Sequence, residues 1–253
     1  MKSYMTLLLA TVASFSTMAQ TYDISEEMIN NSHLRSTYYT KSSLFDFGLS
    51  FDEFINTVDK TKPTIVHSHG CLGVVGTDNE LKNFYTGLGF NFVMLDFHKR
   101  KDARPSCTAS TSTASFFKYN EDPYIRVPPR LYELKHHIKL LKNNGIATIY
   151  ATGHSEGGMT IQLLTDDVEL AVIHGMSCIP LRVKGWNSKI KYLHLVSKND
   201  PILSNFGYMA LFKLTYTCDD RPNYTSVIST VDSHTPLADP IWNQKIKEFL
   251  SAN

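Results

Sequence analysis

Short runs of apolar residues recur along the chain, separated by polar segments and turns. In most runs the apolar residues are consecutive, a pattern typical of strands that are buried on both faces of a parallel sheet. The six runs are Pro63–Ser68, Phe90–Leu95, Ala147–Ala151, Leu170–Ile173, Tyr192–Val196 and Thr225–Ile228. This pattern predicts a sheet built mostly from parallel strands.

Apolar residues at helical spacing lie between these runs. Leu131, Leu134, Ile138 and Leu141 share one face of a predicted helix, which ends at Gly145. The other two predicted helices contain Met159–Leu164 and, near the C-terminus, Trp242, Ile246 and Phe249–Leu250. Because strands and helices alternate, we expect an α/β fold in which helices flank both faces of a mostly parallel central sheet.

The chain of 253 residues is long enough for one domain with a sizeable core. The Ser/Thr-rich stretch Cys107–Ser115 is expected to be a loop, and no second apolar core follows it. The segment between Gly175 and Lys191 is short, which leaves no room for a large cap domain. We therefore predict a single domain over residues 20–253.

Residues 1–19 have the pattern of a signal peptide. Lys2 supplies a positive charge, Tyr4–Phe15 is mostly apolar, and small residues precede a cleavage site after Ala19. The alternative is a buried N-terminal helix. The pattern favours an exported protein, periplasmic or secreted, whose mature chain begins at Gln20.

Composition excludes several classes of partner. Hydrophobic residues make up 42% and charged residues 19% of the chain, as in ordinary globular proteins. Removing Lys2 with the signal peptide leaves 25 − 1 = 24 basic residues against 24 acidic ones. A nearly neutral chain gives no reason to expect nucleic-acid binding. No stretch approaches the ~20 apolar residues of a membrane span, so we expect no membrane insertion of the mature form.

The motif Gly153-His154-Ser155-Glu156-Gly157 follows a predicted strand and opens a predicted helix. A G-x-S-x-G motif in this context is typical of a nucleophile elbow, in which a sharp turn raises the serine above the sheet. The alternative is a glycine-rich turn with an idle serine. The flanking strand and helix favour Ser155 as a catalytic nucleophile.

A serine nucleophile requires a base and an acid, which follow it in the order acid, then histidine. His234 is the one histidine beyond the strand Tyr192–Val196, and it precedes the C-terminal helix. Asp200 directly follows that strand, although it could also serve only to form a turn. The rival acids are Asp219, Asp220 and Asp232. We predict a Ser155–His234–Asp200 triad.

An oxyanion hole needs two backbone N–H donors. The first is expected at Glu156, directly after the nucleophile, and the second at Cys71, with Leu72 as the alternative, in the glycine-flanked turn after Ser68. Aromatic residues in the two longest loops could line a substrate pocket together with Leu72, although core or lid packing explains them equally well. They are Phe116, Phe117, Phe206 and Tyr208.

These residues resemble the dienelactone hydrolase family of α/β-hydrolases, in particular its exported serine members. The matching pieces are His69-Gly70-Cys71, Ala103–Cys107, Arg130 with Glu133, Gly153–Gly158, Asp200 and His234. The founding members use a cysteine nucleophile where this chain has Ser155. Because of this departure we expect hydrolysis of carboxylic esters in general rather than of lactones in particular, and the absence of a large cap domain favours small or chain-end esters.

The resemblance also implies a sheet order, and with it a disulfide pairing. The strands ending at His69 and Asp96 would be neighbours, as would those ending at Gly175 and Ser197. Loops that follow neighbouring strands lie close together, and an exported chain can form disulfides. The implied bonds are Cys71–Cys107 and Cys178–Cys218.

Other polar residues invite simpler interpretations. His67 and His69 could share a strand face, but no third ligand accompanies them, so we expect no metal site. Arg130 and Glu133 are spaced as a helix-surface pair. His136 and His137 are expected at the surface or at the rim of the site.

Acyl transfer by this triad needs no metal or organic cofactor. The sequence therefore predicts a serine esterase that acts on a small-molecule ester. The alternatives are a serine peptidase of prolyl-oligopeptidase type, which usually has an additional gating domain, and a non-catalytic binding protein with the same fold.

Overall fold

The computed structural model describes nine segments of the chain: residues 36–40, 48–99, 107–109, 117–119, 123–178, 188–205, 217–218, 221–235 and 237–252. The predicted signal peptide, residues 1–19, lies outside them. The strands are β1 (Thr37–Tyr39), β2 (Thr64–Ser68), β3 (Asn91–Leu95), β4 (Cys107–Ala109), β5 (Phe117–Tyr119), β6 (Ile149–His154), β7 (Leu170–His174), β8 (Lys191–Ser197) and β9 (Tyr224–Ser229). The helices are α3 (Phe51–Thr57), α4 (Gly76–Gly87), the 3₁₀ helix η2 (Phe97–Lys99), α5 (Pro123–Asn143), α6 (Glu156–Gln162), α7 (Pro201–Asn205) and α9 (Pro240–Ser251).

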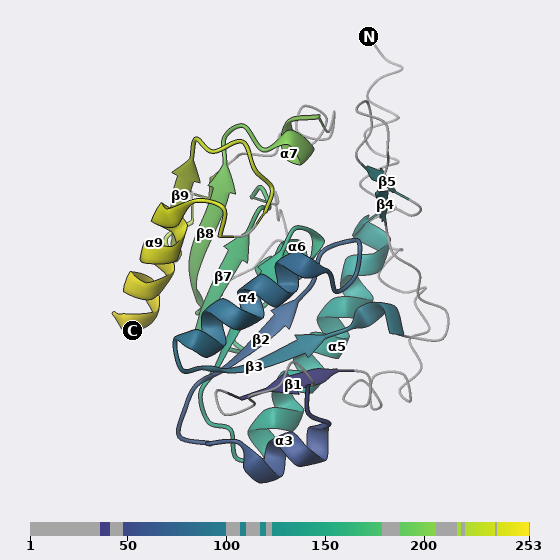
Figure 1. Ribbon diagram of the computed structural model, residues 1–253, viewed down its shortest axis with the longest axis vertical. Coiled ribbons are helices and arrows are strands. Elements are labelled where there is room, and N and C mark those ends of the chain that lie inside the picture. The colour runs from purple at the N-terminus through teal and green to yellow at the C-terminus, as the bar shows by residue number, and fades with distance from the viewer. Residues whose placement is uncertain are drawn as a thin grey trace, which may run out of the picture.

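Seven strands form the central sheet, in the order β1-β3-β2-β6-β7-β8-β9 (Figure 1). All neighbours are parallel except β1, which runs antiparallel to β3. The six predicted strands are all present. From β2 the chain builds outward to β3 on one side and through β6, β7, β8 and β9 on the other. The carboxyl ends of β2 and β6 therefore border the switch point, where open α/β sheets bind their ligands.

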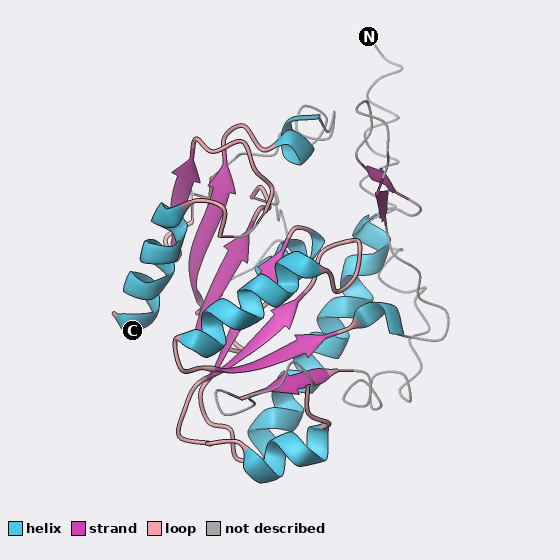
Figure 2. Ribbon diagram, viewed as in Figure 1, coloured by secondary structure: helices cyan, strands magenta, loops and turns pink. Residues whose placement is uncertain are grey.

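Helices cover both faces of the sheet, with α4 and α9 in front and α5 and α6 behind in the view of Figure 2. Successive strand residues point to opposite faces, so Ile65 packs on the side of α4 and α9 while Val66 packs on the side of α5 and α6. Both residues are at most 1% exposed. Double-sided burial explains the consecutive apolar residues of the inner strands β2, β3, β6 and β7.

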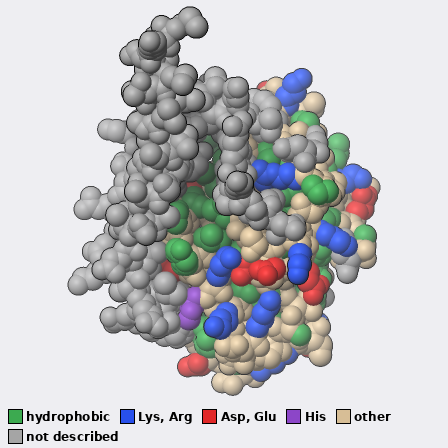
Figure 3. Space-filling model, turned by 180° about the vertical axis from the view of Figure 1, so that it is seen from behind, with side chains coloured by type: hydrophobic (Ala, Val, Ile, Leu, Met, Phe, Trp, Pro, Cys, Tyr) green, Lys and Arg blue, Asp and Glu red, His purple; other side chains and the backbone are tan. Residues whose placement is uncertain are grey.

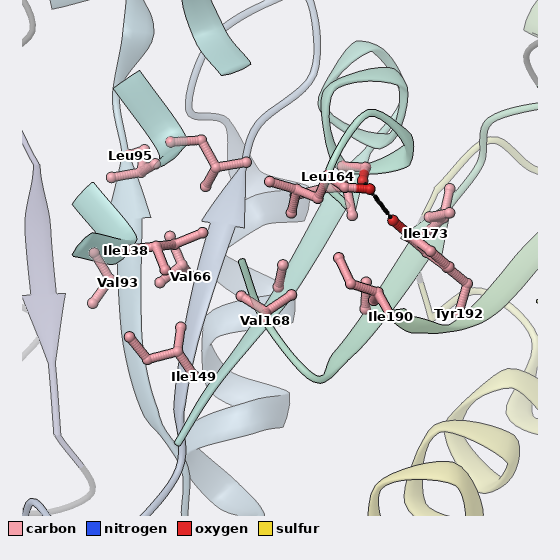
Figure 4. Packing of buried hydrophobic residues seen from close by; sticks show 14 of the residues in the cluster. Val66, Val93, Leu95, Ile138, Ile149, Leu164, Val168, Ile173, Ile190 and Tyr192 are labelled. Atoms are coloured by element: carbon pink, nitrogen blue, oxygen red, sulfur yellow. Dashed lines mark hydrogen bonds between the residues drawn. The ribbon is translucent and has the colours of Figure 1, made fainter. Parts of the chain in front are cut away.

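The core on the side of α5 is the larger of the two clusters. Figure 4 shows Val66 and Val93, from two neighbouring strands, beside Ile138 of α5. The Tyr192 hydroxyl lies in this cluster and donates a hydrogen bond of 2.8 Å to the backbone carbonyl of Leu164. The buried hydroxyl is therefore satisfied, and the apolar packing around it is uninterrupted.

The first described segments contain structure that the sequence pattern did not indicate. β1 adds an antiparallel strand at the edge of the sheet, and Tyr38 in it is fully buried. α3 follows with a capping box, in which Ser50 and Glu53 satisfy each other's backbone N–H groups. The predicted loop Cys107–Ser115 is also corrected at its start, because Cys107–Ala109 pairs with β5.

Two expectations for helix α5 are wrong. Arg130 and Glu133 are 1% and 3% exposed, so they do not form a surface pair. His137 is fully buried, and its Nε2 lies 2.9 Å from the hydroxyl of Tyr38. The sequence spacing was consistent with a solvated face, but β1 and the loop after β2 cover that face of the helix.

Two disulfides join loops at the carboxyl end of the sheet, in the pairing that the family resemblance implied. Cys71 is bonded to Cys107 with a Cα–Cα distance of 5.4 Å, and Cys178 to Cys218 with one of 5.3 Å. All four residues are buried. Such bonds form and persist in oxidising compartments.

The surface seen from behind carries basic and acidic side chains interspersed with one another (Figure 3). This mixture agrees with the formal net charge of +1. Among the described helices, none is both long and apolar enough to cross a membrane.

Candidate active site

Ser155 occupies a strained turn between β6 and α6. Its backbone angles are φ 54° and ψ −121°, outside the regions that non-glycine residues ordinarily adopt. Its N–H donates a hydrogen bond of 2.9 Å to the carbonyl of His174 at the end of β7. α6 then begins at Glu156, so the N-terminal amides of the helix face the turn. This is the geometry of a nucleophile elbow.

The glycines of the motif are required by close backbone contacts. A Cβ added at Gly157 would lie 1.9 Å from the carbonyl oxygen of Ser68, and one added at Gly153 would lie 2.4 Å from the carbonyl oxygen of Gly157. Neither position has space for a methyl group unless the backbone moves. The G-x-S-x-G pattern is therefore a consequence of how tightly the elbow packs against β2 and how closely β6 approaches α6.

His234 and Asp200 are joined on the other side of the site. His234 Nδ1 lies 2.6 Å from Asp200 Oδ2, and the aspartate side chain is fully buried. Asp200 Oδ1 accepts the backbone N–H groups of Ile202 and Leu203 at the start of α7, at 2.8 and 3.0 Å. The carboxylate is thus held at both oxygens. Because it can only accept, Nδ1 carries the proton and the neutral imidazole keeps a lone pair on Nε2.

The backbone of the His234 loop is attached to the elbow through His154. His154 Nε2 donates to the carbonyl oxygen of His234 at 3.0 Å, and the two rings lie 5.0 Å apart between centroids. Burial, together with a smaller contribution from the nearby His234, lowers the pKa of His154 to about 3. A neutral His154 therefore fixes the loop that carries the candidate base.

The loop after β2 lies directly beside the nucleophile. The register of β2 and β6 pairs Ser68 with Gly153, and a Cβ added at Gly70 would lie 3.4 Å from Ser155 Cβ. Cys71 follows and is 6% exposed, whereas Leu72 is half-buried. The two expected oxyanion donors, at Cys71 and Glu156, thus belong to segments on either side of Ser155.

A buried polar network lies behind this loop. Arg130 Nη1 donates to the carbonyl of His69 at 2.8 Å, and its Nη2 lies 3.4 Å from the carbonyl of Gly70 and 3.1 Å from Glu156 Oε1. His98 Nε2 accepts from the same guanidinium at 3.0 Å. One side chain of α5 therefore contacts both segments that carry the expected donors.

His69 has a defined tautomer within this network. The backbone N–H of Phe97 donates to its Nε2 at 3.1 Å, so the proton of the neutral ring is on Nδ1, which lies 2.6 Å from the carbonyl oxygen of Gly70. Burial lowers the pKa of His69 well below its ordinary range, with further contributions from Arg130 and His98. His69 therefore stays neutral and donates to Gly70.

The structure brings together Asp200 and His234, and it places Cys71 and Glu156 beside Ser155. Among the described residues no hydrogen bond joins the Ser155 hydroxyl to His234, whose buried Nε2 has no partner. Catalytic hydrogen bonds are often longer before substrate binds. Of the rival acids, Asp232 is exposed, and Asp219 and Asp220 lie outside the described residues.

Most of the expected pocket residues are outside the described part of the chain. Phe116, Phe206 and Tyr208 belong to segments that the structure does not describe, and Phe117 is described only as part of the backbone of β5. Within the described residues, no group of three or more His, Cys, Asp or Glu side chains is arranged to hold a metal ion.

Sequence reasoning missed three residues of the site: His69, Arg130 and His154. All three belong to segments quoted in the sequence analysis, but none of their side chains is given a role in the site there. These three residues share one feature, a charged or titratable side chain at a position that the fold buries. A buried arginine requires several acceptors, so Arg130 could have been expected to contact backbone carbonyls.

A scan against models of protein families finds no match for this chain, and no curated protein matches it by sequence. Solved structures do share its fold. Est1E from Butyrivibrio proteoclasticus, solved with ferulic acid bound, has a TM-score of 0.51 and 10% identity, covering 86% of this chain and 94% of that one. The esterase Pf2001 from Pyrococcus furiosus has a TM-score of 0.50 and 14% identity, covering 77% and 85%. TT1662 from Thermus thermophilus has a TM-score of 0.50 and 14% identity, covering 76% and 88%.

Together, the sheet order, the elbow and these neighbours define an α/β-hydrolase fold, which confirms the fold class expected from the sequence. At such low identities the similarity concerns the fold alone. The resemblance to the dienelactone hydrolase family is supported at that level, because the family has the same architecture.

Proposed function

We propose that this chain is a serine hydrolase that cleaves carboxylic esters through a covalent acyl-enzyme. The observation that carries the proposal is the pairing of His234 Nδ1 with Asp200 at 2.6 Å, in loops at the same end of the sheet as the strained Ser155 turn. Nucleophile, acid and histidine follow one another in the order that α/β-hydrolases use.

In the first step His234 Nε2 takes the proton of the Ser155 hydroxyl while Ser155 Oγ attacks the ester carbonyl carbon. The backbone N–H groups of Glu156 and Cys71 donate to the resulting oxyanion. When the intermediate collapses, the bond to the alcohol oxygen breaks and the imidazolium returns its proton to that oxygen. Asp200 keeps the ring oriented and stabilises its charged form.

In the second step water replaces the alcohol. His234 removes a proton from the water as its oxygen attacks the acyl carbon, and the proton then passes to Ser155 as the carboxylate leaves. A lactone would follow the same course, with the alcohol still attached to the released acid. No step requires a metal or an organic cofactor.

Small esters fit the proposal better than the alternatives. A prolyl-oligopeptidase-type peptidase has the same triad order, but its usual gating domain has no counterpart among the described elements. A non-catalytic protein would have no need for the strained backbone of Ser155 or for a buried carboxylate paired with a histidine. Because the surface charge is mixed, nothing favours a polyanionic substrate.

The experiment combines active-site labelling with turnover. Purified protein is incubated at about pH 8 with a fluorophosphonate probe, and separately with short p-nitrophenyl esters and a prolyl amide. We expect labelling and ester turnover but no amide turnover. Ser155→Ala should abolish labelling and lower kcat on the order of 10⁴-fold or more.

Ser50→Ala is the matched control, because it removes a serine that caps α3 and should leave labelling unchanged. Amide turnover would favour the peptidase instead. Absence of both labelling and turnover in the parent protein would refute a serine hydrolase of any kind.

We also propose export, with cleavage after Ala19. The support is the apolar N-terminal pattern together with two disulfides, which suit an oxidising compartment. N-terminal sequencing of protein recovered from the periplasm or the medium should begin at Gln20. Retention of residues 1–19 in the recovered protein would contradict the assignment.

A further inference from the structure

Arg130 is buried in the middle of the site without a role in the triad. It is 1% exposed and belongs to α5, which runs behind the elbow. Its guanidinium contacts the carbonyls of His69 and Gly70 on one side and the carboxylate of Glu156 on the other. An arginine so deeply buried is costly unless its donors are satisfied by well-placed acceptors.

The contact with Gly70 determines how the next amide points. In a planar trans peptide, the carbonyl of Gly70 and the N–H of Cys71 point in opposite directions. Arg130 and His69 both donate to that carbonyl, at 3.4 and 2.6 Å, and the backbone N–H of Gly73 donates to it at 3.3 Å. The Cys71 N–H is therefore directed away from them, and Gly70 itself lies against Ser155.

The contact between Arg130 and the Glu156 side chain bears on the second expected oxyanion donor, the backbone N–H of Glu156. The Glu156 side chain is buried, and its Oε1 lies 3.1 Å from Arg130 Nη2. Its backbone N–H opens α6, directly after Ser155. The same planar cation therefore holds both halves of the expected oxyanion hole from behind, and its rigid fork sets the distance between them.

We propose that Arg130 is a positioning residue, which orients the Cys71 and Glu156 amides toward the oxyanion of an ester transition state. The inference rests on the proposed ester hydrolysis. Arg130 does not touch the substrate. Its effect is expected on transition-state stabilisation, and so on kcat more than on KM.

The competing interpretation is that Arg130 only neutralises the buried carboxylate of Glu156. Both interpretations predict damage from Arg130→Met, because that change leaves a buried charge without its partner. They differ for the double variant Arg130→Met/Glu156→Gln, which removes both charges. If charge balance were the whole role, the double variant would recover activity as well as stability.

The test is a double-mutant cycle of Arg130→Met and Glu156→Gln, measured as kcat and KM for p-nitrophenyl acetate and as Tm. Arg130→Met alone should lower Tm by roughly 10 °C. The double variant should regain most of that Tm. It should nevertheless keep a kcat roughly 10- to 100-fold below the parent, with KM changed less than about threefold, as expected when oxyanion donors are misaligned.

Arg130→Lys supplies a second arm that keeps the charge. A lysine can neutralise Glu156 but cannot contact all four acceptors of the guanidinium, so kcat should fall while Tm changes little. A double variant that regains parental kcat, or an Arg130→Lys variant that never lost it, would overturn the positioning role.

Failure of the proposed function has a different signature. If the parent protein neither turns over the ester nor reacts with the fluorophosphonate, the hydrolase assignment fails, and the role of Arg130 fails with it. If the parent is active and the double variant recovers, only the role of Arg130 is lost.

Discussion

On the nucleophile side of the site, Ser155 sits in a turn whose nearest neighbours are backbone atoms of β2 and α6. On the base side, His234 sits in a loop held by side-chain hydrogen bonds to Asp200 and His154. The first arrangement depends on the absence of side chains at Gly153 and Gly157. The second depends on the chemistry and protonation of the side chains present.

The difference indicates that the two sides should respond to different perturbations. Steric changes on the nucleophile side should lower the free energy of unfolding, because the backbone there has no room to adapt. Changes of charge or tautomer on the base side should lower kcat and should affect the free energy of unfolding less. The predictions below test this separation.

The largest effect is expected for Asp200→Asn. The new amide can keep the acceptor for the N–H groups of α7 but presents an NH₂ group to His234 Nδ1, which forces the proton onto Nε2. We expect kcat to fall by roughly 10³- to 10⁴-fold while Tm stays close to that of the parent. Steady-state hydrolysis of p-nitrophenyl acetate checks this.

Asp232→Asn is the matched control, since Asp232 is exposed and lies near His234 in the sequence. It should change kcat less than about twofold, as most surface substitutions away from a site do. A large loss in Asp232→Asn and none in Asp200→Asn would reassign the acid.

The next largest effect is expected for Gly157→Ala. The added methyl group would meet the carbonyl oxygen of Ser68 at 1.9 Å, so β2 and α6 must separate. We expect a loss of about 3 kcal/mol in the free energy of unfolding, measured by urea denaturation. Gly76→Ala is the control because no atom lies within 4 Å of its added Cβ. Equal stability losses in the two variants would contradict the packing argument.

A smaller effect should separate two substitutions of His69. Glutamine can place an acceptor near the position of Nε2, for the Phe97 N–H, but loses the donor to Gly70. Asparagine can keep a donor near the position of Nδ1 and loses the acceptor instead. If the Gly70 carbonyl must be held, His69→Gln should lower kcat roughly 10-fold more than His69→Asn, about the value of one buried hydrogen bond. Matching kcat values at comparable Tm would mean that the ring only fills space.

The effect that is smallest at neutral pH is a change in how stability depends on pH. The native pKa of His154 is about 3, below the ordinary 6.5, because burial disfavours its charged form. The unfolded state therefore binds more protons between these values. His154 thus contributes its full stability above about pH 6.5 and loses it as the pH falls toward 3, by up to about 1.4 kcal/mol per pH unit.

His154→Gln tests this dependence because glutamine can still donate to the His234 carbonyl but does not titrate. Urea unfolding between about pH 7 and pH 4 should show that the free energy of unfolding falls less steeply with decreasing pH in the variant than in the parent. The difference between the two slopes should correspond to nearly one bound proton. The same slope in both proteins would exclude His154 as a source of acid sensitivity.

The fold and the elbow could be predicted because their signals are local. The inner parallel strands are buried on both faces, so their residues are apolar in succession, as in Phe92 and Val93. The elbow is a strand, a turn and a helix within the continuous segment Ile149–Gln162, and its glycines are dictated by that turn. The antiparallel β1 could not be predicted in this way, because three residues around Tyr38 carry too little pattern.

Asp200 and His234 were selected from the sequence by their order after Ser155, and the structure places their side chains in contact. The sequence could order these residues because the loops after parallel strands meet at one edge of the sheet. It could not show which oxygen of Asp200 faces the histidine or that His154 anchors the same loop.

By itself, the sequence determined the α/β class, the turn that carries Ser155 and the candidates for its partners, because these depend on the periodicity and order of residues along the chain. The tertiary structure alone decided the surroundings of Arg130. Its contacts with His69, Gly70 and Glu156 join segments that are distant in the sequence, and only the packing of α5 behind the elbow removes its charge from water. The sequence spacing placed Arg130 on the helix surface. In the folded chain it is buried, and its guanidinium contacts both segments that carry the expected oxyanion donors.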